Sequence, residues 1–239
     1  NSMTIYTVLS LKPSAMPGRR GLEGIFLTAC KIDKKGSKDM ERYHGDLIFD
    51  EHREWFCDWF TDTDNGEHSR SILATGRSEQ FLSAAMLGWV SHTISQGASF
   101  ILAANRDICL DAGKLAVTRG YDVFASTRER TGAELVKKMG KRPMAIIVFI
   151  GEFESDNRIG NEIISSLLGE VVEMGSSRPL AVFIEELPRF GAIAHLEQAV
   201  LLSQSTRLRF GLTAQKCSDV YDTYPSTSAQ ITESCLLLN

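Results

Sequence analysis

Short apolar runs alternate with longer segments of helical periodicity from residue 71 to the end of this 239-residue chain. The apolar runs predict strands at 71–75, 99–104, 121–126, 144–150, 180–186 and 208–214. The runs at 144–150 and 180–186 are apolar almost without interruption, which is typical of parallel strands that are covered by helices on both faces.

Helical patterns fill the intervals between these strands. Apolar residues three and four apart predict a helix over 159–171, and another helix follows the first strand over about 79–95. Asn105 or Asp107 can cap the helix that ends near Gly120. Helical segments are also predicted after the last strand, and they carry Val220, Tyr221, Ile231 and Cys235. Such alternation predicts an α/β fold with a mainly parallel central sheet flanked by helices.

Residues 1–70 have a less regular pattern, in which 3–11 is the clearest strand. The stretch 54–60, "EWFCDWF", holds four aromatic residues. It is interpreted either as an aromatic patch against the domain or as a subunit interface, since exposed aromatic residues favour interfaces. We therefore divide the chain into an N-terminal segment, 1–70, packed on or extending the core, and a domain, 71–239.

Composition narrows the function only slightly. The hydrophobic share of 43% and the charged share of 23% are ordinary for a globular protein. The net charge of -4 provides no overall positive field, so a DNA contact would have to be local and shared among subunits. Five cysteines without CxxC spacing indicate reduced thiols, mostly in the core. No apolar run approaches the roughly 20 residues that span a bilayer.

Two adjacent acids, Glu185 and Glu186, end the predicted strand at 180–186. In nucleotide-driven motors, the first acid of such a pair holds magnesium and the second polarises the attacking water. Gln215, at the end of the next predicted strand, is suited to sense a γ-phosphate or that water. The alternative is a core strand that simply leaves the core into solvent, and the acid pair alone does not decide between the two.

The run "RPLAVFIEELPRFGAIAHLEQAVLLSQSTRLRFGLTAQKCSDVYDTYPSTSAQITESC" resembles the C-terminal half of the type IV secretion coupling proteins, the TraG-like ATPases of conjugation. The resemblance covers 142–238 well and 71–126 more loosely, and it says little about 1–70. It implies a RecA-like P-loop NTPase fold, ATP and Mg²⁺ as ligands, and a homo-oligomeric ring, usually a hexamer.

The same resemblance implies a place in the cell and a set of partners. Coupling proteins recruit or translocate DNA or protein substrates, together with adaptor and secretion-channel proteins, at the cytoplasmic face of the bacterial inner membrane. Members carry transmembrane helices and a helical insertion within the motor. The interval 126–144 is too short for that insertion, and we expect the parent protein to be membrane-anchored.

The stretch "ATGRSEQF", 74–81, stands where the family has its phosphate-binding loop, which needs glycines, a lysine and a hydroxyl. Its candidate ligand-binding residues are Thr75, Gly76, Arg77, Ser78, Glu79 and Gln80. Thr75 and Gly76 fit the pattern. Glu79, however, replaces the lysine and so reverses the charge beside a polyanion, while Ser78 and Gln80 replace the second glycine and the hydroxyl.

Two functions therefore stay open: a motor that hydrolyses ATP, or a degenerate ATPase-like scaffold or protein-interaction subunit of the same apparatus. Under the first, Glu186 is the catalytic residue, Glu185 the metal ligand and Gln215 the sensor. Arg207 and Arg209 would then reach a neighbouring subunit's nucleotide; the alternative is that both are surface arginines at a strand edge. On physical grounds the loop favours poor catalysis.

Overall fold

The computed structural model describes residues 71–76, 78–125, 136, 139, 142–150, 154–174 and 179–238. The predictions for the segment 1–70, including its strand and its aromatic cluster, lie outside the described residues, and so does Arg77.

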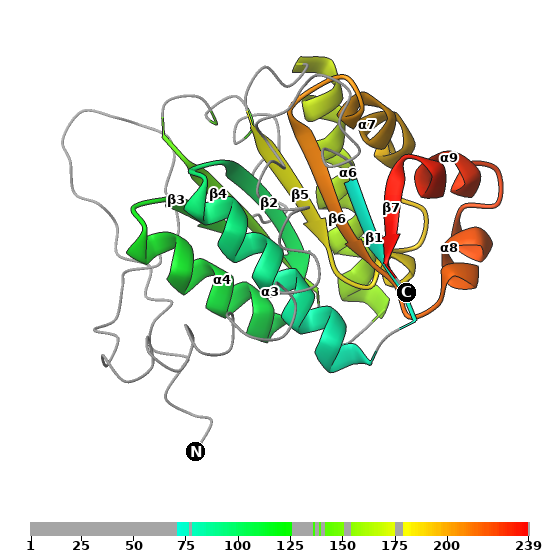
Figure 1. Ribbon diagram of the computed structural model, residues 1–239, viewed down its shortest axis with the longest axis horizontal. Coiled ribbons are helices and arrows are strands. Elements are labelled where there is room, and N and C mark those ends of the chain that lie inside the picture. Colours follow the sequence, from blue (N-terminus) through cyan, green and yellow to red (C-terminus); the bar gives the residue numbers. More distant parts are fainter. Residues whose placement is uncertain are drawn as a thin grey trace.

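One sheet of seven strands forms the centre of the described fold (Figure 1). In chain order the strands are β1 (Ser71–Ala74), β2 (Ser99–Ala104), β3 (Asp122–Ala125), β4 (Met144–Phe149), β5 (Leu180–Ile184), β6 (Leu208–Thr213) and β7 (Cys235–Leu238). Across the sheet their order is β3-β4-β2-β5-β6-β1-β7, and each neighbouring pair runs parallel. The predicted α/β fold with a mainly parallel sheet is confirmed.

Helices cover both faces of this sheet. They are α3 (Glu79–Ser95), α4 (Arg106–Thr118), α6 (Glu154–Met174), α7 (Leu196–Ser203), α8 (Cys217–Thr223) and α9 (Ser228–Glu233), with a 3₁₀ turn, η3 (Leu187–Phe190), directly after the acid pair. Figure 1 shows α3 and α4 on one face and α6 and α7 on the other, with α8 and α9 beside β7.

The residues of β5 show why its run is apolar without interruption. Val182 and Ile184 belong to the core cluster on the side of α6 and α7. Ala181 and Phe183 belong to the cluster on the side of α3 and α4. Since successive side chains of a strand point to opposite faces, a strand buried on both faces needs an apolar residue at each position.

A close approach fixes α3 against the sheet. Gly211 in β6 leaves room for two large rings, because a Cβ atom there would lie 2.7 Å from Trp89 Cε3 and 2.7 Å from Phe183 Cδ1. Both ring-bearing residues are fully buried. α3 therefore packs closely over β5 and β6, and this brings its first turns to the edge of the sheet where the acid pair lies.

One sequence prediction near the chain's end is wrong. Cys235 was expected on a helical segment, but it begins β7, and α9 ends two residues earlier, at Glu233. The run Cys235–Leu238 pairs in parallel with Ser71–Ala74. Four consecutive apolar residues carry no helical periodicity, and pairing with β1 satisfies their backbone groups along one side.

Candidate functional site

The carboxyl ends of three adjacent strands, β5, β6 and β1, bring most of the predicted site residues together. Thr75 and Gly76 follow β1, Glu185 and Glu186 follow β5, and Gln215 lies two residues after β6. Because the strands are parallel and adjacent in the order β2-β5-β6-β1, their carboxyl ends form one edge, which is where open α/β sheets bind ligands. We call this the carboxyl edge.

The first residues of the predicted phosphate-binding loop continue the sheet. The backbone N–H of Thr75 donates to the Leu238 carbonyl at 2.7 Å, and that of Gly76 donates to the Gln215 carbonyl at 3.0 Å. Gly76 has φ +74°, which suits glycine and turns the chain towards α3. The backbone amides of Thr75 and Gly76 therefore both donate to protein carbonyls.

The other described loop residues form the start of α3. Ser78 is its N-cap, and the Ser78 Oγ accepts from the Phe81 N–H at 3.3 Å. Glu79 lies in the first turn, where a carboxylate interacts favourably with the helix dipole. Glu79 and Gln80 are both exposed. This start is well formed as a helix cap, and it places the carboxylate of Glu79 at the position where the resemblance predicts a lysine.

Glu185 is held by donors from two other parts of the chain. Its Oε2 accepts from the backbone N–H of Asn105 at 2.6 Å. Its Oε1 accepts from the Asn105 Nδ2 at 2.9 Å and from the Ser83 Oγ at 3.2 Å. The residue is 4% exposed. Each oxygen of the predicted metal ligand thus already has a protein partner.

The neighbouring Glu186 differs in its backbone and its partners. It has φ +52° and ψ +55°, a left-handed conformation that is uncommon outside glycine. Its N–H donates to the Thr213 Oγ1 at 2.9 Å. Its Oε1 is buried and has no hydrogen-bond partner among the described residues. Strained backbone of this kind collects at functional sites, so Glu186 keeps its place as a candidate.

The pKa values of both acids are raised, chiefly because burial disfavours the charged form. Hydrogen bonds from Asn105 and Ser83 lower the pKa of Glu185, and one from the Gln215 side chain lowers that of Glu186. The charge of Glu79 raises the pKa of both acids. The charge of the exposed Arg189 of η3 lowers both pKa values, so Glu79 and Arg189 both lie within electrostatic range of the acid pair.

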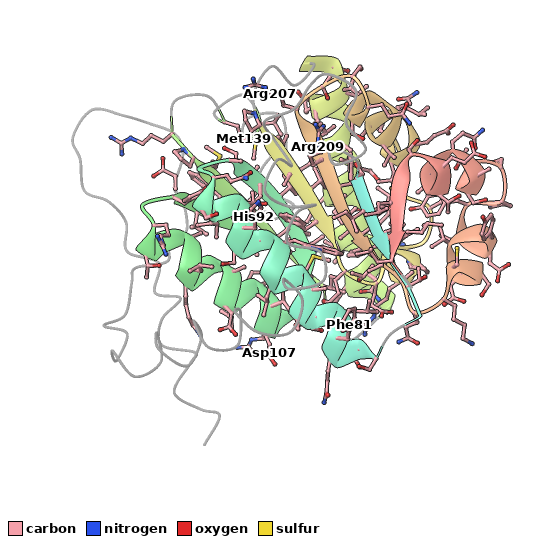
Figure 2. The ribbon with its side chains drawn as sticks, viewed as in Figure 1. Phe81, His92, Asp107, Met139, Arg207 and Arg209 are labelled. Carbon is pink, nitrogen blue, oxygen red and sulfur yellow. The ribbon has the colours of Figure 1, made fainter. Side chains whose placement is uncertain are left out.

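Arg209 is not brought to this edge. Figure 2 shows Arg207 and Arg209 at the opposite end of the sheet from Phe81 and Asp107, which belong to the first turns of α3 and α4. Arg209 is 2% exposed, and its Nη1 donates to the carbonyls of Ser203, Thr206 and Leu208. A guanidinium enclosed in this way cannot extend into a neighbouring subunit, so we leave Arg209 out of the candidate site. Arg207 is exposed.

Sequence reasoning missed two residues of the carboxyl edge. Asn105 was expected only as a helix cap, and Ser83 was not singled out. Asn105 does cap α4, but it also directs both of its N–H-bearing groups at Glu185. The available signal was that Asn105 directly follows a strand, β2, whose neighbour in the sheet ends in the acid pair. Ser83, in the second turn of a mostly apolar helix, carried no such signal.

A magnesium–nucleotide complex does not fit this set of residues. The loop amides pair with the sheet, Glu79 adds negative charge, and the oxygens of Glu185 already accept hydrogen bonds from protein groups. Within the described ranges, no group of three or more His, Cys, Asp or Glu side chains is arranged to hold a metal ion.

A hollow of about 320 Å³ lies elsewhere, between the start of α7 and the connection from α8 to α9. Its lining includes His195, Glu197 and Tyr224. None of the predicted site residues lines it. The Tyr224 hydroxyl accepts from the Ile193 N–H at 3.0 Å and donates to the Gly191 carbonyl, so it joins α8 to the turn after the acid pair.

No family model matches the chain, and no curated protein matches it either. Among the residues that the structure describes, no helix combines the length and apolar character needed to cross a membrane. The functional argument therefore rests on the residues of the carboxyl edge.

Proposed function

We propose that residues 71–239 form an ATPase-like domain of the coupling-protein type that serves a type IV secretion or conjugation apparatus as a scaffold or docking subunit, without using ATP. The run 178–235 supports the family assignment through its residues. The strand order supports it too, because β6 separates the strand of the loop, β1, from the strand of the acid pair, β5, and all three end at one edge. A RecA-like P-loop ancestry accounts for this arrangement.

The observation that carries the proposal is the position of Glu79. Its charge raises the pKa of both acids of the pair, so a third carboxylate lies within electrostatic range of Glu185 and Glu186. Two unit charges about 4 Å apart interact by about 4 kcal/mol at an effective dielectric near 20. Replacing a lysine by a glutamate turns that attraction into a comparable repulsion. Even after solvent screening, this exceeds the 1.4 kcal/mol of a tenfold change in affinity.

The proposed setting follows from the family resemblance. In it, the parent protein is anchored at the cytoplasmic face of the bacterial inner membrane, assembles as a homo-oligomeric ring, and contacts secretion-channel and substrate-adaptor proteins. The cargo is DNA or protein. A domain that keeps the motor fold without nucleotide contributes surfaces for assembly and docking, while other proteins of the apparatus supply the energy.

Titration with a fluorescent ATP analogue and Mg²⁺ tests this proposal, with Glu79→Lys as the decisive variant. We expect no measurable binding or hydrolysis by the unmodified chain, and a gain in affinity of at least tenfold for Glu79→Lys, because the substitution restores the cation. Glu173→Lys is the matched control. It makes the same charge change at an exposed position near the C-terminal end of α6, and it should leave nucleotide binding unchanged. Micromolar binding by the unmodified chain that Glu79→Lys abolishes would disprove the proposal.

A further inference from the structure

Glu185 joins three elements of the carboxyl edge that are far apart in the sequence. Its own position at the end of β5 is held by its N–H, which donates to the Ala103 carbonyl of β2 at 2.9 Å. Its carboxylate accepts hydrogen bonds from Asn105, before α4, and from Ser83, in α3. The partners lie 80 and 102 residues away from it in the chain.

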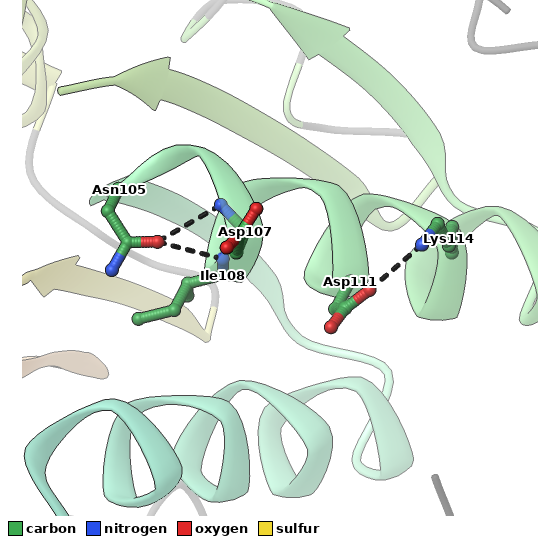
Figure 3. Close-up of polar contacts among 5 residues, drawn as sticks. All are labelled: Asn105, Asp107, Ile108, Asp111 and Lys114. Carbon is green, nitrogen blue, oxygen red and sulfur yellow. Dashed lines mark hydrogen bonds and ion pairs between the residues drawn. The ribbon is translucent and has the colours of Figure 1, made fainter. Parts of the chain in front are cut away.

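Asn105 passes this contact on to α4. Its Oδ1 accepts from the N–H groups of Asp107 at 3.0 Å and Ile108 at 3.1 Å, which are otherwise unpaired at a helix start (Figure 3). Its Nδ2 donates to Glu185 at the same time. The amide thus has one orientation that serves both partners: oxygen to the helix and nitrogen to the acid.

The carboxylate is matched to its donors. A buried carboxylate is tolerated only where donors surround it, and Glu185 has two N–H donors and one hydroxyl donor in a nearly solvent-free position. In a motor domain the first acid of the pair instead faces a metal ion. In this chain the same position faces protein groups from β2, α4 and α3.

We propose that Glu185, Asn105 and Ser83 form a structural clamp, in which the buried carboxylate at the end of β5 holds α3 and α4 to the sheet. The clamp joins the carboxyl edge through protein donors, so that it fixes the start of both helices against the sheet. It does not rest on the proposed function, since it concerns the folding of the edge and not the partners of the protein.

Replacing the amide that donates to Glu185 by a carboxylate tests the clamp in the 239-residue chain. Asn105→Asp keeps a good N-cap for α4 but sets a carboxylate against Glu185. We expect the folding equilibrium constant to fall by about tenfold to a hundredfold, the range for a lost hydrogen bond to a charged group. Glu185→Gln should then rescue Asn105→Asp, because the glutamine amide donates to the new aspartate. The double variant should regain at least half of the decrease in the logarithm of the folding equilibrium constant.

Ser78→Asp is the matched control, because it also adds a carboxylate at an N-cap, that of α3, without a described contact to Glu185. It should leave the folding equilibrium unchanged within about twofold. If Asn105→Asp fails to fold, recovery of a cooperative unfolding transition in the double variant is the readout. If Asn105→Asp is as stable as the unmodified chain, the clamp is overturned. It is also overturned if the loss of stability in the double variant equals or exceeds the sum of the losses in the two single variants.

Excess Mg²⁺ provides a second readout. The clamp predicts the same thermal midpoint with and without Mg²⁺. A midpoint that Mg²⁺ raises in the unmodified chain but not in Glu185→Gln would make Glu185 a metal ligand and would also overturn the clamp. Neither measurement is made with nucleotide present. ATP binding would therefore disprove the proposed function and leave the clamp intact, and loss of the clamp would leave the proposed function intact.

Discussion

The two ends of the central sheet each enclose a charged side chain, but they use it differently. At the amino-terminal end of β6, Arg209 donates from one guanidinium nitrogen to three backbone carbonyls around the end of α7. At the carboxyl edge, Glu185 accepts from Asn105 and Ser83, while the adjacent Glu186 keeps a buried oxygen without a partner among the described residues. The Arg209 guanidinium is thus held by hydrogen bonds within the fold, whereas Glu186 at the carboxyl edge keeps an oxygen without a partner among the described residues.

This difference indicates which charges are structural and which are available for chemistry. A buried charge whose hydrogen bonds all go to nearby protein groups stabilises the local structure and has little capacity left for a ligand. A strained acid with an unpartnered oxygen costs stability and is kept where it has another use. Arg209 and Glu185 belong to the first kind, and Glu186 belongs to the second.

The largest effect that would test this comparison is expected at Arg209. Arg209→Met leaves three carbonyl groups near the end of α7 without their donor, and we expect it to lower the free energy of unfolding by about 3–5 kcal/mol, since each unsatisfied buried group costs about 1–3 kcal/mol. Arg207→Met, two residues earlier and exposed, is the control and should change stability by less than about 0.5 kcal/mol. Urea denaturation measures both. Equal effects of the two substitutions would show that Arg209 is not a structural cation.

The acid pair is expected to give a smaller, pH-dependent effect. Both pKa values are raised above the ordinary value of 4.5, so the two acids bind protons more tightly in the folded chain than in the unfolded chain. Their contribution to stability is therefore complete below about pH 4.5 and is lost as the pH rises through the raised pKa values. The difference in stability between the unmodified chain and Glu185→Gln/Glu186→Gln should decline over that window. Denaturation curves at a series of pH values measure it, and a difference that grows with pH would contradict the assignment.

The smallest effect is expected from the backbone of Glu186. Glu186→Gly removes the cost of a left-handed conformation and a buried oxygen without a partner, and we expect it to raise the free energy of unfolding by about 1 kcal/mol. His195→Gly is the matched control, because His195 also has a positive φ, +66°, but lies exposed at the start of α7. His195→Gly should raise the free energy of unfolding only by the cost of the left-handed backbone. A loss of stability in Glu186→Gly larger than in the control would show that the acid supports the fold, as Glu185 does.

Local pattern was sufficient for most of the architecture. The predicted strand at 99–104 and the predicted helix at 79–95 coincide with β2 and α3. Burial on both faces produces the unbroken apolar runs of β4 and β5, so these two could be assigned as parallel strands. β7 was missed because four apolar residues after a helical segment become a strand only through pairing with β1.

The candidate site was predictable in position but not in its contacts. Glu185, Glu186 and Gln215 each follow a predicted strand, and carboxyl ends of parallel strands share an edge. Whether Arg209 faced solvent or the interior could not be read from its alternation with Arg207, because a buried arginine needs acceptors that come from a different segment, the end of α7.

By itself, then, the sequence determined the α/β architecture, the acid pair at the carboxyl edge and the negative charge of Glu79 after the first strand. These follow from the order of residue types along the chain, which sets periodicity, strand ends and local charge. Only the tertiary structure decided that Glu185 meets Asn105 and Ser83, and that Arg209 is enclosed at the opposite end. Hydrogen bonds act over about 3 Å between groups that folding alone brings together, so local sequence carries no record of which donor meets which acceptor.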